Sequence, residues 1–494
     1  MTALASPCEQ AHFAAVPSKP RGLYRLVLVL VWLGTAASGV VFAEPAPVDL
    51  SLILLIGLLP LAGLVTFSQP LLVYAALWLL VTAGGCIGAM SAFDFAVAGK
   101  QVLTTFYLSL ASVALAAFFQ CDPARHVRLV LNAYLLAAVI ATLAALIGYF
   151  DIIPSFTELL TEFGRARGTF KDPNVYGAFV VPALVYALHL GFTKRRLTAT
   201  LALAVTAFLL LGVLLSFSRG AWSNAAVSLG LFCFLSFATS RSNIARVRII
   251  GLFWVSAISG VAVLWLAIQS PAVSALLTER AQVEQSYDTL PNGRFAGHEI
   301  AKALIASHPQ GIGPLQFGGN YHQEDVHEVY LNVLLGHGWL GGSAYILVVA
   351  LTLIIGFVAA LRRGPAQGML LVALSAFAGA VGEGFVVDTD HWRHFFLLMS
   401  VIWGIYLGAK PNPPGAAAGG PPIVRQGRRR PWTAWPDDDL PLKSRSTWLS
   451  SASSRQQVAD RSGRCSHSGH LDAYQRQAGL RSGAICPRRM RLVR

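Results

Sequence analysis

Long apolar runs constrain this chain more than any other feature. A membrane-spanning helix needs about 20 consecutive apolar residues, and the sequence contains about twelve such runs. They cover residues 24–43, 50–67, 70–91, 101–119, 127–150, 173–192, 197–216, 220–240, 247–268, 338–360, 368–387 and 393–409. Only 13% of the residues are charged, against roughly 25% in a soluble domain. We therefore predict an all-α, polytopic integral membrane protein.

These runs divide the chain into three parts. We expect a cytoplasmic N-terminal segment at 1–23, a transmembrane domain at 24–409 and a disordered basic cytoplasmic tail at 410–494. The tail is rich in Pro, Gly, Ser and Arg and has no periodic apolar pattern. The first apolar run is too long for a secretory signal and has no small-residue cleavage site after it, so we expect it to remain as a helix.

The net charge of +14 belongs mostly to the tail. Sixteen basic and five acidic residues follow Ala409, so the tail carries +11 and the rest of the chain +3. This distribution gives no indication of a nucleic-acid partner. The tail arginines could contact anionic lipid headgroups, although a solvated, dispensable extension explains them better.

Basic residues in short loops predict which side of the membrane each loop occupies, because positive flanks stay cytoplasmic. With the N-terminus inside, the tight basic clusters all fall on the cytoplasmic side. They are Lys19, Arg21 and Arg25; Arg125 and Arg128; Lys194, Arg195 and Arg196; Arg241, Arg246 and Arg248; and Arg362 and Arg363. The short opposite loops carry acids instead. Twelve spans with both termini cytoplasmic are therefore self-consistent.

Two longer outside segments, about 151–172 and 269–337, break this pattern. Several basic residues are predicted to lie outside, against the charge rule. They are Arg165, Arg167, Lys171, Arg219, Arg280, Arg294 and Lys302. Some are expected to be solvated loop charges, but the group is the first indication of a functional site.

The first candidate motif runs from Arg165 to Gly177. Asp172 precedes Pro173, which is typical of a helix N-cap followed by proline at the first helical position. Arg165, Arg167 and Lys171 would then lie beside a helix N-terminus, an arrangement that attracts anions.

The second motif is Ser216-Phe217-Ser218-Arg219, where one arginine stands between two apolar runs. An ionisable residue near membrane depth indicates function by default. The alternative is that Arg219 extends to the interface beside Trp222.

The third motif lies in the long loop. Arg294 precedes a helical pattern at 296–307 and faces either a ligand or water. Beyond it, the apolar spacing from Asp325 predicts a helix that places His327 beside Tyr330, where an imidazole can exchange a proton near neutral pH. A polar rim residue and a metal site with His322 and Glu324 are the alternatives, although the spacing is not that of a zinc helix.

Other patterns argue against particular sites. The segment from Gly336 to Gly341 matches G-x-G-x-x-G but lacks the strand and acidic residue of a dinucleotide site, so we expect these glycines to break a short loop helix before the tenth span. The cysteines fall in predicted cytoplasmic segments or helices, so neither disulfides nor zinc are indicated. They are Cys8, Cys86, Cys121, Cys233, Cys465 and Cys486.

In combination, these motifs resemble a known family. The order is a GTF-x-DPN-x-x-G segment, an S-x-SR-G-A-W segment, an arginine-headed loop helix with HP-x-GIGP, and H-x-x-YL followed by GWLGG. This order is similar to that of the O-antigen ligase and polymerase family of bacterial envelope glycan assembly, over roughly residues 20–409. Family members commonly have asparagine after the loop histidine, whereas this chain has Glu328.

The resemblance implies a glycosyltransferase of the bacterial inner membrane, active at the periplasmic face in lipopolysaccharide or exopolysaccharide synthesis. The donor would be a glycan on undecaprenyl pyrophosphate, and the acceptor lipid A-core or a growing polysaccharide, with no cofactor and no required metal. Arg219, Arg294 and His327 match the family's catalytic positions. Arg165, Arg167, Lys171, Asp388 and Asp390 are expected to bind substrate at the pocket rim.

A transporter or flippase of lipid-linked glycans is the main alternative, because topology does not decide function. Carriers keep their charged sites near the midplane, whereas the charges here concentrate in outside loops. A membrane scaffold explains the hydrophobicity but not the outside arginines.

Overall fold

The computed structural model describes residues 21–269, 274, 278 and 293–409. The predicted tail, most of the predicted N-terminal segment and Arg280 lie outside the described residues.

Each of the twelve apolar runs lies on a helix. These helices are α1 (Arg21–Ala37), α2 (Pro47–Leu61), α3 (Gln69–Ala89), α4 (Phe95–Cys121), α5 (Pro123–Tyr149), α7 (Pro173–Thr193), α8 (Arg196–Leu215), α9 (Arg219–Thr239), α10 (Asn243–Ile268), α14 (Val329–Ala360), α15 (Gln367–Glu383) and α16 (Arg393–Gly408). Within the described residues, eight helical segments are long and apolar enough to cross a membrane, and four shorter apolar helices accompany them. The prediction of a helical, polytopic membrane protein is confirmed in this form, while the number of spans remains a prediction.

Short elements lie in the two longer loops. Between α5 and α7 are the 3-10 helix η1 (Pro154–Phe156), the short helix α6 (Thr157–Leu160), and strands β1 (Thr161–Glu162) and β2 (Arg165–Ala166). The two strands pair antiparallel, with Thr161 opposite Ala166. Helix α13 (Arg294–Ser307) lies in the second loop, as the pattern at 296–307 predicted.

Side-chain caps explain where several helices begin. Asp172 Oδ1 accepts hydrogen bonds from the amides of Asn174 and Val175 at 2.6 and 3.3 Å, and Pro173 is the first residue of α7. The predicted N-cap is therefore confirmed. Asp94 caps α4, Asp122 caps α5 and Ser218 caps α9 in the same way, each satisfying amides that a helix leaves unpaired.

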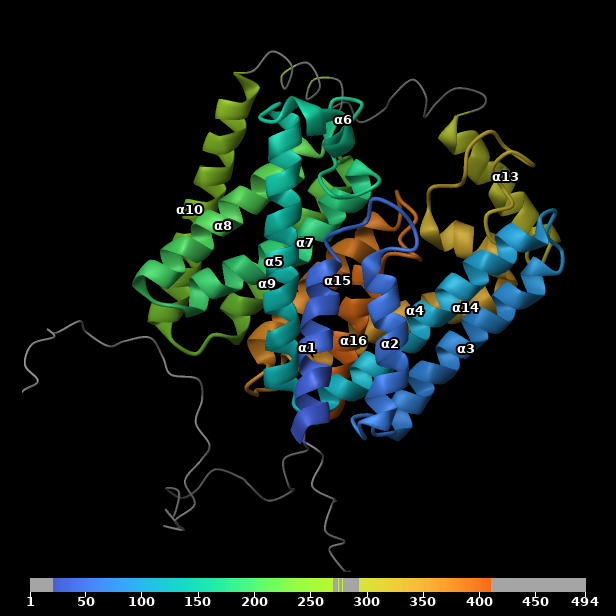
Figure 1. Ribbon diagram of the computed structural model, residues 1–494, viewed down its shortest axis with the longest axis horizontal. Coiled ribbons are helices and arrows are strands. Elements are labelled where there is room, and N and C mark those ends of the chain that lie inside the picture. The colour runs from blue at the N-terminus through green and yellow to red at the C-terminus, as the bar shows by residue number, and fades with distance from the viewer. Residues whose placement is uncertain (1–20, 270–273, 275–277, 279–292, 410–494) are drawn as a thin grey trace, which may run out of the picture. The chain divides into compact units, whose positions relative to one another are not determined.

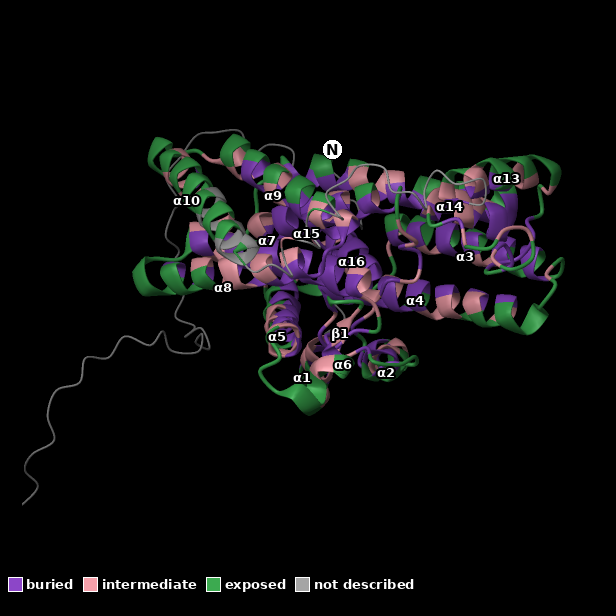
Figure 2. Cartoon of the chain, turned by 90° about the horizontal axis from the view of Figure 1, so that it is seen from above, coloured by how far each residue is buried: buried purple, intermediate pink, exposed green. Residues whose placement is uncertain are grey.

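The helices pack in pairs that are often distant in sequence. Helix α14 packs along α3, α16 along α4, α15 along α9, and α7 along α8 (Figure 1). Small residues allow the closest approach, since a Cβ added at Gly84 of α3 would lie 2.4 Å from the Gly341 amide of α14. Helices α7 and α16 are largely buried, whereas α10 shows mainly exposed side chains (Figure 2).

One ion pair joins the N-termini of α2 and α16. Arg393 donates from Nε and Nη2 to the two carboxylate oxygens of Asp49 at 2.6 and 2.7 Å. Tyr107 donates to the same carboxylate at 2.9 Å, and Glu44 lies 3.5 Å from Arg393. This bidentate pair fixes the region next to the turn at 384–392.

Helix α14 is interrupted at Gly338, whose φ of 65° and ψ of −174° are not helical. The loop after α13 covers the break, because the Trp339 amide donates to the Pro309 carbonyl at 2.8 Å and Ile312 donates to Leu335 at 2.9 Å. The prediction that glycines in Gly336–Gly341 end a loop helix before the tenth span is confirmed at Gly338.

Replacing Gly338 with alanine should lower the thermal stability of the protein. A non-glycine residue in such a conformation costs about 1–3 kcal/mol, and the new Cβ would also lie 2.5 Å from the Gln310 carbonyl carbon. We expect a clear fall in the unfolding midpoint of the purified protein in detergent. Gly230→Ala is the control, because a Cβ there meets nothing within 4 Å and alanine favours helix; equal midpoints for the two variants would contradict this account.

Candidate functional site

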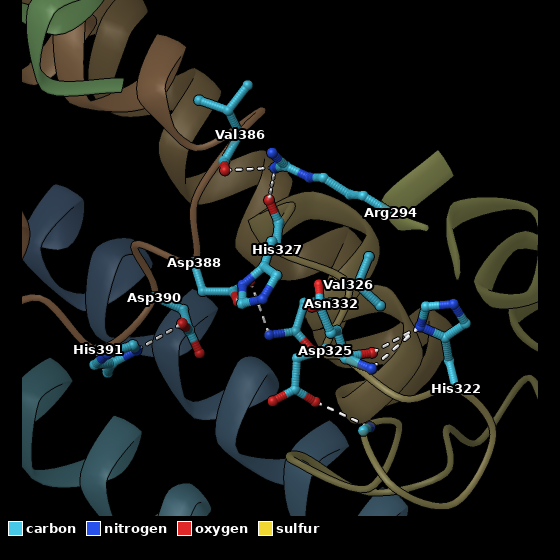
Figure 3. Close-up of polar contacts among 12 residues, drawn as sticks. Arg294, His322, Asp325, Val326, His327, Asn332, Val386, Asp388, Asp390 and His391 are labelled. Carbon is cyan, nitrogen blue, oxygen red and sulfur yellow. Dashed lines mark hydrogen bonds and ion pairs between the residues drawn. The ribbon is translucent and has the colours of Figure 1, made fainter. Parts of the chain in front are cut away.

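A ladder of polar contacts joins the start of α14 to the end of α15 and the turn that follows it. Figure 3 shows its contact between Asn332 and Asp388. The Val329 amide donates to the Gly384 carbonyl at 2.9 Å, and the Tyr330 hydroxyl donates to the Val381 carbonyl at 2.7 Å. Asn332 Nδ2 donates to Asp388 Oδ1 at 3.1 Å. This ladder holds the start of α14, directly after His327, against the segment that contains Asp388.

His327 lies on this ladder with its ring against Asp388. The distance from Nδ1 to Asp388 Oδ2 is 3.6 Å, and about half of the histidine side chain is exposed. The Asp388 carboxylate raises the pKa of His327 above its usual range, although partial burial opposes this shift. The pair therefore places a partly exposed imidazole beside a carboxylate that stabilises the protonated form of the imidazole.

The predicted helix from Asp325 is wrong at its start, because α14 begins at Val329. The backbone just before α14 is not helical, and its carbonyls bind side chains of α13. Val326 is buried and its carbonyl is hydrogen-bonded to His298 Nε2 at 2.9 Å, and His327 has a φ of 49°. His327 is therefore presented by a left-handed turn, a conformation uncommon outside glycine.

Arg294 is the first residue of α13 and connects the two sides of the ladder. Its Nη2 donates to the carbonyls of His327 and Val386, both at 2.5 Å. Its Nε is buried and has no hydrogen-bond partner in the described part of the chain. A buried guanidinium N–H without a partner is costly, so this atom is suited to an anionic ligand.

Arg219 lies on α9, which packs along α15, the helix that precedes this turn. It begins α9 directly after Phe217, which has a φ of 49°. Next to it, Gly220 faces Glu383, whose Oε1 would lie 2.9 Å from an added Cβ. Glu383 ends α15 and accepts from Asn224 at 2.7 Å, so α9 and the ladder share the end of α15.

Arg165 and Arg167 hold the loop before α7. Arg165 Nε donates to the Ser216 carbonyl at 2.8 Å, and its Nη2 donates to Asn174 at 2.7 Å. Arg167 donates to the carbonyls of Glu158, Leu159 and Lys171 at 3.1–3.3 Å. In this structure both guanidinium groups bind protein acceptors and brace the loop.

Lys171 is exposed and stands at the rim of a cavity of about 450 Å³. The wall of this cavity is mainly apolar and comes from α1, α2, α4, α5 and α16, while charged groups such as Glu44 and Arg393 occur at its edge. Lys302, by contrast, forms an exposed pair with Glu299 at 2.7 Å. This agrees with the expectation that some of the outside basic residues are solvated loop charges.

Asp390 lies two residues beyond Asp388 and pairs with His391. The distance from His391 Nδ1 to Asp390 Oδ1 is 3.0 Å, and Asp390 is buried. Burial raises the pKa of Asp390, but His391 outweighs this effect and leaves it below the usual value. Burial lowers the pKa of His391, but Asp390 outweighs this effect, so the pKa of His391 is above its usual value.

The sequence reasoning missed His391, Arg393 and Asn332. Arg393 had a usable signal, because it is a basic residue at the predicted outside end of a span. Asn332 and His391 had no such signal, because only the folded structure shows that they lie beside Asp388 and Asp390. Over the described ranges, no three His, Cys, Asp or Glu side chains are arranged to hold a metal ion, and His322 contacts the Glu324 backbone at 3.2 Å.

The family comparison agrees with the motif analysis. The model of the O-antigen ligase family matches residues 204–346, a segment that contains Arg219, Arg294 and His327. No curated protein matches the chain. The resemblance seen in the motifs is therefore confirmed, since residues 204–346 match the O-antigen ligase family.

Proposed function

We propose that this protein transfers a glycan from an undecaprenyl-pyrophosphate-linked donor to an acceptor hydroxyl, as an O-antigen ligase or polysaccharide polymerase. The observation that carries the proposal is the His327–Asp388 pair beside Arg294, within the segment that matches the family. The family supports glycan transfer in O-antigen synthesis. Donor, acceptor and independence from metal ions belong to the proposal.

Arg294 and Arg219 are suited to the leaving group. As the bond between the anomeric carbon and the phosphate oxygen breaks, negative charge grows on the pyrophosphate. Guanidinium groups bind phosphate oxygens strongly in a water-poor site. The buried Nε of Arg294 offers an unused donor for this purpose.

His327 is suited to deprotonate the acceptor. Its Nδ1 faces Asp388, so Nε2 would accept the hydroxyl proton while the acceptor oxygen bonds to the anomeric carbon. The pyrophosphate departs with the electrons of the broken bond. A single displacement of this kind inverts the anomeric configuration.

The remaining candidates take supporting roles. Asp388 holds and polarises His327, and Asp390 borders the same site. Lys171, at the rim of the apolar cavity, is placed to meet the phosphate end of a lipid. Arg165 and Arg167 shape the loop that presents Lys171.

The protein is an integral membrane protein of the bacterial inner membrane in this proposal, with both termini cytoplasmic and the site periplasmic. The charge pattern of the short loops supports this orientation. The eight long apolar helical segments support membrane insertion.

Replacing Arg219, Arg294 or His327 with alanine should abolish glycan transfer without affecting membrane insertion. Loss of a general base costs about 10²- to 10⁴-fold in rate, and loss of one electrostatic donor about 10²- to 10³-fold. The assay combines purified protein, an undecaprenyl-pyrophosphate glycan and lipid A-core or a lipid-linked repeat, with EDTA present. Mass analysis of the lipid products then distinguishes ligase from polymerase.

Arg195→Ala is the matched control, because this exposed arginine lies in the predicted cytoplasmic turn between α7 and α8. Retained transfer in all three properly inserted variants would refute the proposed site. If the wild-type protein instead moves the lipid-linked glycan across a liposome membrane without transfer, the transporter alternative is correct.

The rate of transfer should rise with pH as His327 loses its proton. Because Asp388 raises the pKa of His327, Asp388→Asn should lower that pKa and move the acid limb of the pH–rate profile to lower pH. The maximal rate should also fall, since the ring is less well held. Asp151→Asn, in the other outside loop, should leave the limb in place; a limb that does not move in Asp388→Asn would exclude His327 as the base.

A further inference from the structure

A second cavity, of about 250 Å³, is lined in part by Asp388, the carboxylate that pairs with His327. It is bounded by the segment before α14, the start of α14 and the turn between α15 and α16. Asp325 and Asp388 both line it, and Asp388 is the residue paired with His327. Any group held in this cavity therefore lies next to the proposed base.

The polar lining of this cavity is strongly acidic. The carboxylates of Glu44, Asp325, Asp388 and Asp390 face it, against the imidazoles of His337 and His391. Even with both imidazoles protonated, the lining remains negative. Carboxylates accept several hydrogen bonds each, so the lining favours a ligand rich in hydroxyl or amino donors.

His337 supplies independent evidence for a ligand. It is only 3% exposed and lines the cavity, yet among the residues that the structure describes neither Nδ1 nor Nε2 has a hydrogen-bond partner. Buried polar side chains are nearly always hydrogen-bonded. The ring is fixed by close packing, since a Cβ added at Gly85 of α3 would lie 2.7 Å from its Cδ2.

We infer that this cavity binds one uncharged or amino-bearing sugar unit of the acceptor and rejects sugars that carry carboxylate or phosphate. The inference rests on the proposed function and adds the acceptor chemistry to it. A volume of about 250 Å³ lies just below the roughly 300–1,000 Å³ of drug-sized sites, which suits a single sugar. A hydroxyl can donate to the carboxylates and both donate to and accept from His337, whereas an anion is repelled.

Binding of monosaccharide probes tests the inference without any donor. The full chain in lipid nanodiscs is mixed with methyl glucoside, methyl glucosaminide or methyl glucuronide, and saturation-transfer NMR measures binding. We expect binding of the first two and little or none of the glucuronide. In Asp325→Asn/Asp390→Asn, the preference for glucoside over glucuronide should fall by about fivefold or more.

Asparagine keeps an acceptor oxygen for the Gly318 amide, 3.0 Å from Asp325, and for His391, so these changes remove charge with little change of shape. Glu324→Gln is the matched control, because this neighbouring carboxylate is exposed and does not line the cavity; it should keep the wild-type preference. His337→Phe should weaken binding of all the sugars, because it fills the same space without polar atoms.

Equal binding of the three sugars by the wild-type protein, no binding of any, or an unchanged preference in the double variant would each overturn the inference. The proposed function has a separate test. Selective sugar binding without transfer from the lipid-linked donor would leave the cavity intact and refute transfer. Efficient transfer to anionic acceptors would refute the selectivity of the cavity and leave the proposed function standing.

Discussion

One guanidinium group holds the two halves of the site together. Arg294 donates to the carbonyls of His327, just before α14, and of Val386, just after α15. The ladder from Val329 to Asn332 continues the same connection. Irregular backbone near a membrane is tolerated only where protein or water satisfies its polar groups. The ladder meets this requirement and, in doing so, places His327 against Asp388.

Much of the fold was predictable because its signals are local. Apolar runs located the eight long and four shorter apolar helices of the described residues, and Asp172-Pro173 located the start of α7. The glycines near Gly338 located the break in α14, because a φ of 65° with a ψ of −174° is essentially restricted to glycine. The family was likewise recognisable from the order of short motifs.

The details of the site depend on contacts between segments far apart in sequence. The spacing after Asp325 is helical, yet Val326 and His327 remain outside α14 because their carbonyls bind His298 and Arg294. Likewise, nothing near Asp388 in the sequence indicates that it faces His327. Arg165 illustrates the opposite case, since a basic residue that suggested anion binding is used to join β2 to the ends of α7 and α8.

The break in α14 also limits how the site can open. The amide and the indole of Trp339 donate to carbonyls of the α13 segment, at Pro309 and Ile305. If the turn after α13 moved away, it would leave unpaired donors on a helix that is long and apolar enough to cross a membrane. Movement of that turn would therefore cost both hydrogen bonds, so the turn after α13 is anchored to α14.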